Sequence, residues 1–184
     1  LEKLFKPKSK SPVTLVRIAC HIHEFNDCLP AANWLKENGY SVGFNLMQIS
    51  DCPYEEITKY AKNASSYPID VLYFADSLGS LDQQTLIKII QAFQIGWKGA
   101  LGIHTHDNMG KAIANIKQSI ESGLTWIDST VTGMGRGPGN AQTEYLILSL
   151  EERFKNQQSF IKLFKVIQKY FKPMQNHYGW GMNP

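Results

Sequence analysis

The sequence Gly-Ile-His-Thr-His-Asp-Asn at residues 102–108 decides how this chain folds, because an apolar segment ends there and a helical pattern begins. We predict a buried strand over residues 100–106, followed by a helix. Side chains alternate along a strand, so His104 and His106 would leave its carboxyl end on the same face. Paired imidazoles are typical of metal sites, but so short a pattern equally fits two strand-end histidines bonded to loop groups.

Further strands are predicted on both sides of this stretch. Continuous apolar and β-branched residues indicate strands at 13–20, 42–49, 70–75 and 125–130. Helical patterns separate them, so that a strand begins roughly every 25 to 30 residues, which predicts an α/β fold with a parallel sheet. This period fits a partial (β/α)8 TIM barrel comprising about the last five βα units. It fits a five-stranded doubly wound sheet of flavodoxin type equally well.

The composition is that of a globular protein with one substantial core, since 43% of the 184 residues are hydrophobic and 19% are charged. We divide the chain into an irregular arm or helix end at 1–12, a partial barrel at 13–155, and a C-terminal helix and tail at 156–184, the tail beginning at Pro173. The basic residues are scattered apart from the run between Lys3 and Lys10, so we expect no nucleic-acid partner.

Two further observations concern the surroundings of the protein. No run approaches the roughly 18 apolar residues of a membrane span, so we expect no membrane partner. The three cysteines show no metal-knuckle spacing, and an odd number does not suit a secreted disulfide framework. We therefore expect a cytoplasmic protein.

Polar residues gather at the predicted carboxyl ends of the strands, where parallel βα folds place their functional loops. Arg17, Asn45 and Ser77 are candidates for contact with a ligand. An arginine within an apolar strand requires an anion or a carbonyl, because an unpaired buried charge is costly. A structural ion pair and a substrate clamp both satisfy that requirement. Asx-turns or helix caps are expected for the strand-end aspartates, which are Asp76, Asp107 and Asp128.

A glycine-rich turn, Gly133 to Gly139, follows the last predicted strand. Backbone amides in such a turn can hold phosphate, but the turn lacks the lysine spacing of a Walker motif and the register of a dinucleotide site. We interpret it as a loop that lets Asn140 approach the mouth of the sheet.

Several of these motifs together resemble a known family. Residues 102–108, Ile127-Asp128-Ser129, the turn 133–140 and Glu144 are similar to the last two βα units of the pyruvate-carboxylase/hydroxymethylglutaryl-CoA-lyase-like metal-dependent aldolase superfamily. Matches at 16–19, 42–44 and 74–79 make the 4-hydroxy-2-oxovalerate aldolases the most similar branch. The resemblance covers about residues 13–155.

The resemblance implies a TIM barrel with two metal-ligating histidines, here His104 and His106, and Asn140 as a further ligand. The family's aspartate ligand and catalytic arginine belong to its first strand, and this chain has no counterpart for that Arg-Asp motif. The lyase branch carries a catalytic cysteine in the glycine-rich turn. Residues 133–139 contain none, which favours the aldolase branch.

The activity implied is aldol cleavage or formation of a 4-hydroxy-2-oxo acid through a metal-stabilised pyruvate enolate. The cofactor would be Mn²⁺ or Mg²⁺, with Zn²⁺ or Co²⁺ as alternatives. Arg17, Asn45 and Ser77 would contact the small-molecule 2-oxo acid, the catalytic base remains unassigned, and a homo-oligomer is expected. The alternative function is a catalytically inactive module that binds a small molecule or assembles with other segments.

Overall fold

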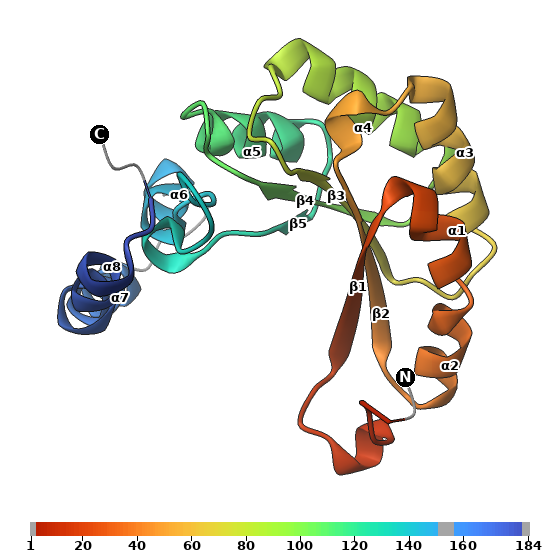
Figure 1. The fold of residues 1–184 in the computed structure, drawn as a ribbon, viewed down its shortest axis with the longest axis horizontal. Coiled ribbons are helices and arrows are strands. Elements are labelled where there is room, and N and C mark those ends of the chain that lie inside the picture. The colour runs from red at the N-terminus through yellow and green to blue at the C-terminus, as the bar shows by residue number, and fades with distance from the viewer. Residues whose placement is uncertain (1–2, 151–156, 182–184) are drawn as a thin grey trace.

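The computed structural model describes residues 3–150 and 157–181. Its centre is one parallel sheet of five strands (Figure 1). The strands are β1 (Leu15–His21), β2 (Ser41–Met47), β3 (Val71–Asp76), β4 (Ala100–Thr105) and β5 (Trp126–Ile127). The helices are α1 (Phe25–Cys28), α2 (Ala31–Glu37), α3 (Tyr54–Ala64), α4 (Gln83–Gly96), α5 (Ala112–Glu121), α6 (Thr143–Ser149), α7 (Gln157–Val166) and α8 (Lys172–Tyr178).

The strands pair in the order in which they occur in the chain, β1-β2-β3-β4-β5, and every pair is parallel. A doubly wound sheet of flavodoxin type has the order 2-1-3-4-5 and carries helices on both faces, so the observed order excludes it. Right-handed connections between sequential neighbours place the helices on one side. Figure 1 shows α1 to α5 along the outer side of the curved sheet. The prediction of a partial (β/α)8 barrel is confirmed.

The hydrophobic core lies between the outer face of the sheet and these helices. Alternate strand residues point to this side and meet one apolar stripe of each helix. Phe74 of β3 stacks on Phe93 of α4 with ring centroids 5.2 Å apart, and Phe25 of α1 meets Phe44 of β2 edge to face. The remaining strand residues face the concave inner side, where the polar residues gather.

The inner face is curved strongly enough for its two edge strands to meet through their side chains. Arg17 of β1 forms an ion pair with Asp128, the residue after β5. In a flat sheet four strand spacings, about 19 Å, would separate these edges. Tyr73 of β3 lies between them, and the guanidinium carbon of Arg17 stands 4.4 Å from the centroid of its ring. A side chain at Gly102 of β4 would collide with that ring, so this glycine leaves the space that Tyr73 occupies.

Most predicted strand boundaries lie within two residues of those observed, and two elements differ by more. The predicted strand 125–130 is reduced to Trp126 and Ile127. The cause is that the end of β4 pairs with the glycine-rich turn instead, through a bridge between His106 and Asn140 and a hydrogen bond from the Ala141 N–H to the Thr105 carbonyl.

The second difference concerns the last helix. The tail was predicted to begin at Pro173, but the helix continues to Tyr178. A π-helical turn, Ile167–Phe171, leads from α7 into α8. Pro173 lies in the first turn of α8, where the missing N–H of proline is tolerated.

The predicted boundary between residues 155 and 156 lies outside the described residues. Within the predicted N-terminal arm, residues 3–12 form a 3-10 turn at Lys8–Lys10 and otherwise irregular backbone. Across the ranges 3–150 and 157–181, no helix has the length and apolar character needed to cross a bilayer.

Candidate metal and substrate site

His104 and His106 lie side by side at the carboxyl end of β4. Their ring centroids are 5.2 Å apart and their planes are inclined by 77°. Both side chains are partly buried, because they lie at the end of the strand, between the core and the solvent. The alternation of the strand therefore brings two imidazoles together, as the sequence predicted.

Asn140 joins this pair through the backbone. The bridge between His106 and Asn140 is flanked by a hydrogen bond from the Asp107 N–H to the Gly139 carbonyl, at 2.9 Å. The Asn140 side chain donates from Nδ2 to the Met134 carbonyl at 3.1 Å, whereas its Oδ1 is buried and has no hydrogen-bond partner among the described residues. An unsatisfied buried carbonyl oxygen is costly and is a group that a cation can satisfy.

The approach of Asn140 depends on the glycines of the turn. A Cβ at Gly135 would lie 2.7 Å from the Asn140 Nδ2, which is closer than real Cβ contacts. A residue with a side chain at position 135 would therefore displace the Asn140 amide group. This agrees with the interpretation of the turn as a loop that lets Asn140 approach the mouth of the sheet.

A hydrogen-bonded network links His104 to the opposite edge of the sheet. Asp128 Oδ2 is 2.9 Å from His104 Nδ1 and 2.7 Å from Arg17 Nη2, while Asp128 Oδ1 accepts from Arg17 Nη1 at 2.8 Å. Burial acts to raise the pKa of Asp128, but the hydrogen bonds from His104 and Arg17 outweigh it and hold that pKa below its ordinary value. The carboxylate is therefore ionised at neutral pH.

The electrostatic surroundings of His106 favour its neutral form. Burial lowers the pKa of His106 below the ordinary imidazole value, and the nearby His104 and Arg136 lower it further. A neutral imidazole has a lone pair free for a ligand, so this histidine is in the form that metal coordination requires at neutral pH.

The three residues predicted to contact substrate are found in different situations. Asn45 is buried on the inner face of β2, and its Oδ1 has no hydrogen-bond partner within the described ranges. Ser77 is buried just after β3; its Oγ accepts from the Gln48 N–H at 2.9 Å, and its own hydroxyl proton remains available. Arg17 is engaged by Asp128, so of the two roles left open for it the structure shows the ion pair.

Sequence reasoning missed three residues of this region. Asp128 was expected to form a turn or cap, as Asp76 and Asp107 do by accepting backbone N–H groups, but it binds two side chains instead. Tyr73 supports Arg17, and Arg136 of the glycine-rich turn reaches the Ser77 carbonyl at 3.4 Å. The inward parity of Tyr73 on its strand was a usable signal, whereas the contact of Arg136 depends on how the turn folds.

Trp180, which follows α8, contacts the glycine-rich turn. Trp180 is buried, and its Nε1 donates to the carbonyl and hydroxyl oxygens of Thr132, each at 3.2 Å. Thr132 has a positive φ of 56°, a conformation that is strained for a β-branched residue. The Oε2 of buried Glu144 also accepts a hydrogen bond from the Thr132 backbone N–H at 3.0 Å. Both contacts hold the turn that presents Asn140.

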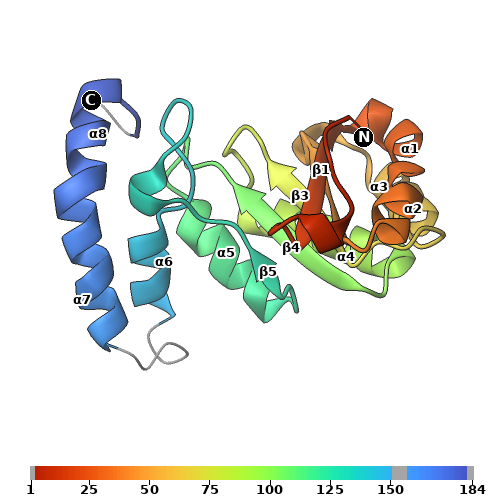
Figure 2. The same cartoon turned by 90° about the horizontal axis from the view of Figure 1, so that it is seen from below.

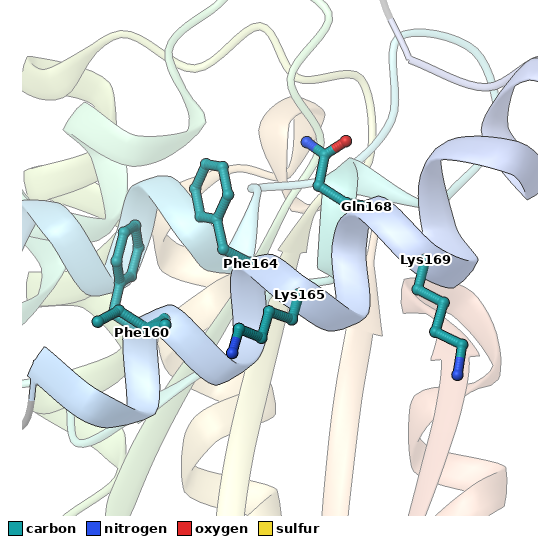
Figure 3. Close-up of a pocket in the computed structure, with 6 residues that line it drawn as sticks. Phe160, Phe164, Lys165, Gln168 and Lys169 are labelled. Atoms are coloured by element: carbon teal, nitrogen blue, oxygen red, sulfur yellow. The ribbon is translucent and has the colours of Figure 1, made fainter.

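An apolar hollow is formed by α7, away from the carboxyl end of the sheet. Figure 3 shows its lining side chains, which come from α7 and the π-helical turn, and in Figure 2 α7 stands beyond α6 from the sheet. The apolar residues of the lining are Phe160, Ile161 and Phe164. The hollow holds no carboxylate or imidazole, so the inner mouth of the sheet remains the candidate site.

The residues present fit a divalent cation in part. Among residues 3–150 and 157–181, no group of three or more His, Cys, Asp or Glu side chains is placed to hold a metal ion. The two imidazoles carry nitrogen donors, and the buried Asn140 oxygen, which has no partner among the described residues, is an oxygen donor on the same side of the sheet end. Such a set suits a divalent transition metal and leaves positions for other ligands.

Comparison with known proteins shows the family of the chain. The model of the HMGL-like family matches residues 13–169. A 4-hydroxy-2-oxovalerate aldolase from Carboxydothermus hydrogenoformans is 35% identical over 143 residues, which are 77% of this chain and 42% of that protein. The chain spans 40 to 47% of the length of the curated relatives that it matches.

Two solved structures resemble the chain over nearly its whole length. The N-terminal domain of a Bacteroides vulgatus protein has a TM-score of 0.84 and 29% identity, covering 93% of this chain and 57% of that chain. HMG-CoA lyase from Bacillus subtilis has a TM-score of 0.78 and 18% identity, covering 93% of this chain and 65% of that chain. At that identity the likeness to the lyase shows the fold alone.

Proposed function

Because the chain belongs to the HMGL-like family, we propose that it carries part of the active site of a divalent-metal-dependent aldolase that cleaves or forms a 4-hydroxy-2-oxo acid. The identity of about a third to curated 4-hydroxy-2-oxovalerate aldolases supports this reaction. The observation that carries the proposal is the pairing of two imidazoles with an unsatisfied amide oxygen across one backbone bridge.

His104, His106 and Asn140 would hold the cation. Imidazole nitrogen with amide oxygen suits Mn²⁺ better than Mg²⁺, and Zn²⁺ or Co²⁺ also fits such a set. When bound, the cation supplies Lewis acidity toward the oxygens of a 2-oxo acid. The chain's own contribution is to keep His106 neutral by burial and to hold Asn140 in place through the glycine-rich turn.

Asn45, Ser77 and Arg136 would meet the substrate. Asn45 Oδ1 is an acceptor without a partner among the described residues, and the Ser77 hydroxyl can donate. Arg17 was predicted to balance the substrate's negative charge, but both of its terminal nitrogens bind Asp128. Arg136 reaches Ser77 and forms no ion pair with a carboxylate of the described residues, so we propose it as a second arginine that can balance the substrate's charge, beside Arg17.

The test is made on the complete protein that contains this sequence. Release of pyruvate from a 4-hydroxy-2-oxo acid is measured with added Mn²⁺ for the wild type and for His104→Ala, His106→Ala and Asn140→Ala. We expect loss of turnover and of Mn²⁺ affinity in all three. His177→Ala, which removes an exposed histidine on α8, is the matched control and should leave both unchanged. Wild-type protein that binds Mn²⁺ but releases no pyruvate would contradict the aldolase assignment.

A further inference from the structure

We propose that Asp128 is a positioning residue for His104: its carboxylate fixes the ring proton on Nδ1 and leaves the Nε2 lone pair free for a ligand. The inference rests on the proposed function insofar as that ligand is a metal ion. The hydrogen bond itself, with His104 Nδ1 and Asp128 Oδ2 2.9 Å apart, is independent of that function.

The assignment of the proton follows from the chemistry of the two partners. A carboxylate has acceptors and no donor, so the ring nitrogen that faces it must carry the hydrogen. In a neutral imidazole the other nitrogen is then an acceptor. Histidines that bind metals commonly donate their second N–H to a carboxylate in this way, which fixes both tautomer and ring orientation.

Arg17 keeps Asp128 in the state and orientation that this role requires. The guanidinium contacts both carboxylate oxygens, and a two-point contact of this kind fixes the carboxylate plane as well as its charge. Oδ2 serves Arg17 and His104 together, so the bond to the imidazole is made in addition to the ion pair. Side chains of Arg17 and Asp128 are 31% and 20% exposed, which limits competition from water.

Tyr73 and Gly102 complete the support. The Tyr73 ring lies against the Arg17 guanidinium at 4.4 Å, and the absence of a side chain at Gly102 gives that ring its space. Tyr73 therefore positions Arg17, Arg17 positions Asp128, and Asp128 positions the His104 ring. Arg17, Tyr73, Gly102 and His104 are strand residues, and Asp128 directly follows β5. Arg17 acts on the histidine through Asp128.

The tautomer of His104 tests this directly. The 184-residue chain is labelled with ¹⁵N-histidine, and long-range proton–nitrogen correlations are recorded at about pH 8.5, above the ordinary imidazole range. We expect His104 to carry its proton on Nδ1. In Asp128→Asn the single amide oxygen should turn to Arg17, the NH₂ group should face Nδ1, and the proton should move to Nε2. Asp82→Asn, at the N-cap of α4, is the matched control and should leave the tautomer unchanged.

Mn²⁺ affinity, measured by titration of the same variants in the complete protein, separates the two proposals. Loss of a carboxylate behind a metal-bound histidine typically weakens metal binding about 10- to 100-fold, and that is the change expected for Asp128→Asn. If the His104 tautomer shifts in Asp128→Asn but the wild type does not bind Mn²⁺, the proposed metal site is wrong and the positioning role is still supported. The positioning role would be overturned if wild-type His104 carried its proton on Nε2, or if Asp128→Asn kept the wild-type tautomer. The wild-type spectrum gives the first of these results even if the variant does not fold.

Discussion

Arg17 and Asp128 lie 111 positions apart in the sequence, yet both oxygens of the aspartate contact the arginine, at 2.8 and 2.7 Å. The pair connects β1 with the residue after β5 across the concave face of the sheet. It therefore contributes to the curvature of the fold and to the orientation of His104 together.

Breaking this ion pair should cost more than breaking an exposed one. We expect Arg17→Gln to lower the free energy of unfolding by about 1 to 2 kcal/mol, between the values for surface and buried pairs, because Asp128 is left partly buried without its partner. Lys36→Gln, which removes the more exposed pair of Lys36 with Asp70, is the comparison and should cost less than about 1 kcal/mol. Urea unfolding measures both, and equal losses would show that the Arg17 pair is no more than a surface contact.

Gly102→Ala should displace the Tyr73 ring. The added Cβ would collide with that buried ring, and overpacking of this kind costs about 1 to 3 kcal/mol. The double variant Gly102→Ala/Tyr73→Ala removes the collision, so the two changes should be less destabilising together than the sum of the single changes. Thermal or urea unfolding of the four proteins gives the coupling energy. Strict additivity would mean that the ring has room to move aside.

Trp180→Phe should loosen the glycine-rich turn. The change keeps an aromatic ring but removes the N–H that donates to Thr132, at a cost of about 1 kcal/mol. If the turn opens locally, amide exchange at Gly139 and Asn140 should rise about fivefold. Trp97→Phe removes a similar indole hydrogen bond, to the Ala100 carbonyl at 3.0 Å, and should leave exchange in the turn unchanged. The prediction fails if both variants, or neither, alter the turn.

Asp70 gives a pH dependence of known sign. Burial acts to raise its pKa, but hydrogen bonds from Lys36 and the Val42 N–H outweigh this and hold its pKa below the ordinary value. A carboxyl group with a lowered folded-state pKa stabilises the protein above its unfolded pKa of about 3.9, and this stabilisation is lost as the pH falls through the folded value. The stability difference between wild type and Asp70→Asn should therefore be largest near neutrality and shrink below about pH 4. A difference that stays constant from neutral to acid pH would count against it.

The sequence predicted the repeating βα units from apolar runs separated by helical patterns, and the shared face of His104 and His106 from the alternation of side chains along a strand. Both signals are local. The sequence did not separate a barrel from a doubly wound sheet, because that choice depends on the order of strand pairing, which the period does not contain. The residues of the resembling motifs supplied the barrel, and the observed strand order confirmed it.

The role of Asp128 could not be predicted for a related reason. Its partners are Arg17, four strands away, and His104 on the adjacent strand, so its contacts depend on the curvature of the sheet. Local reasoning assigned it to a turn or cap, which was correct for Asp76 and Asp107, whose backbone N–H partners lie within five residues in the sequence. The shortened β5 has the same origin, because residues of the glycine-rich turn compete for the end of β4.

The central claim is that His104, His106 and Asn140 together bind a divalent cation. The most direct measurement is the broadening of side-chain NMR signals when substoichiometric Mn²⁺ is added to the labelled chain, because a paramagnetic ion broadens the groups nearest to it. We predict that the signals of these three residues broaden first and that excess Mg²⁺ or a chelator restores them. Broadening centred on other residues, or broadening of the same strength in His104→Ala/His106→Ala, would contradict the claim.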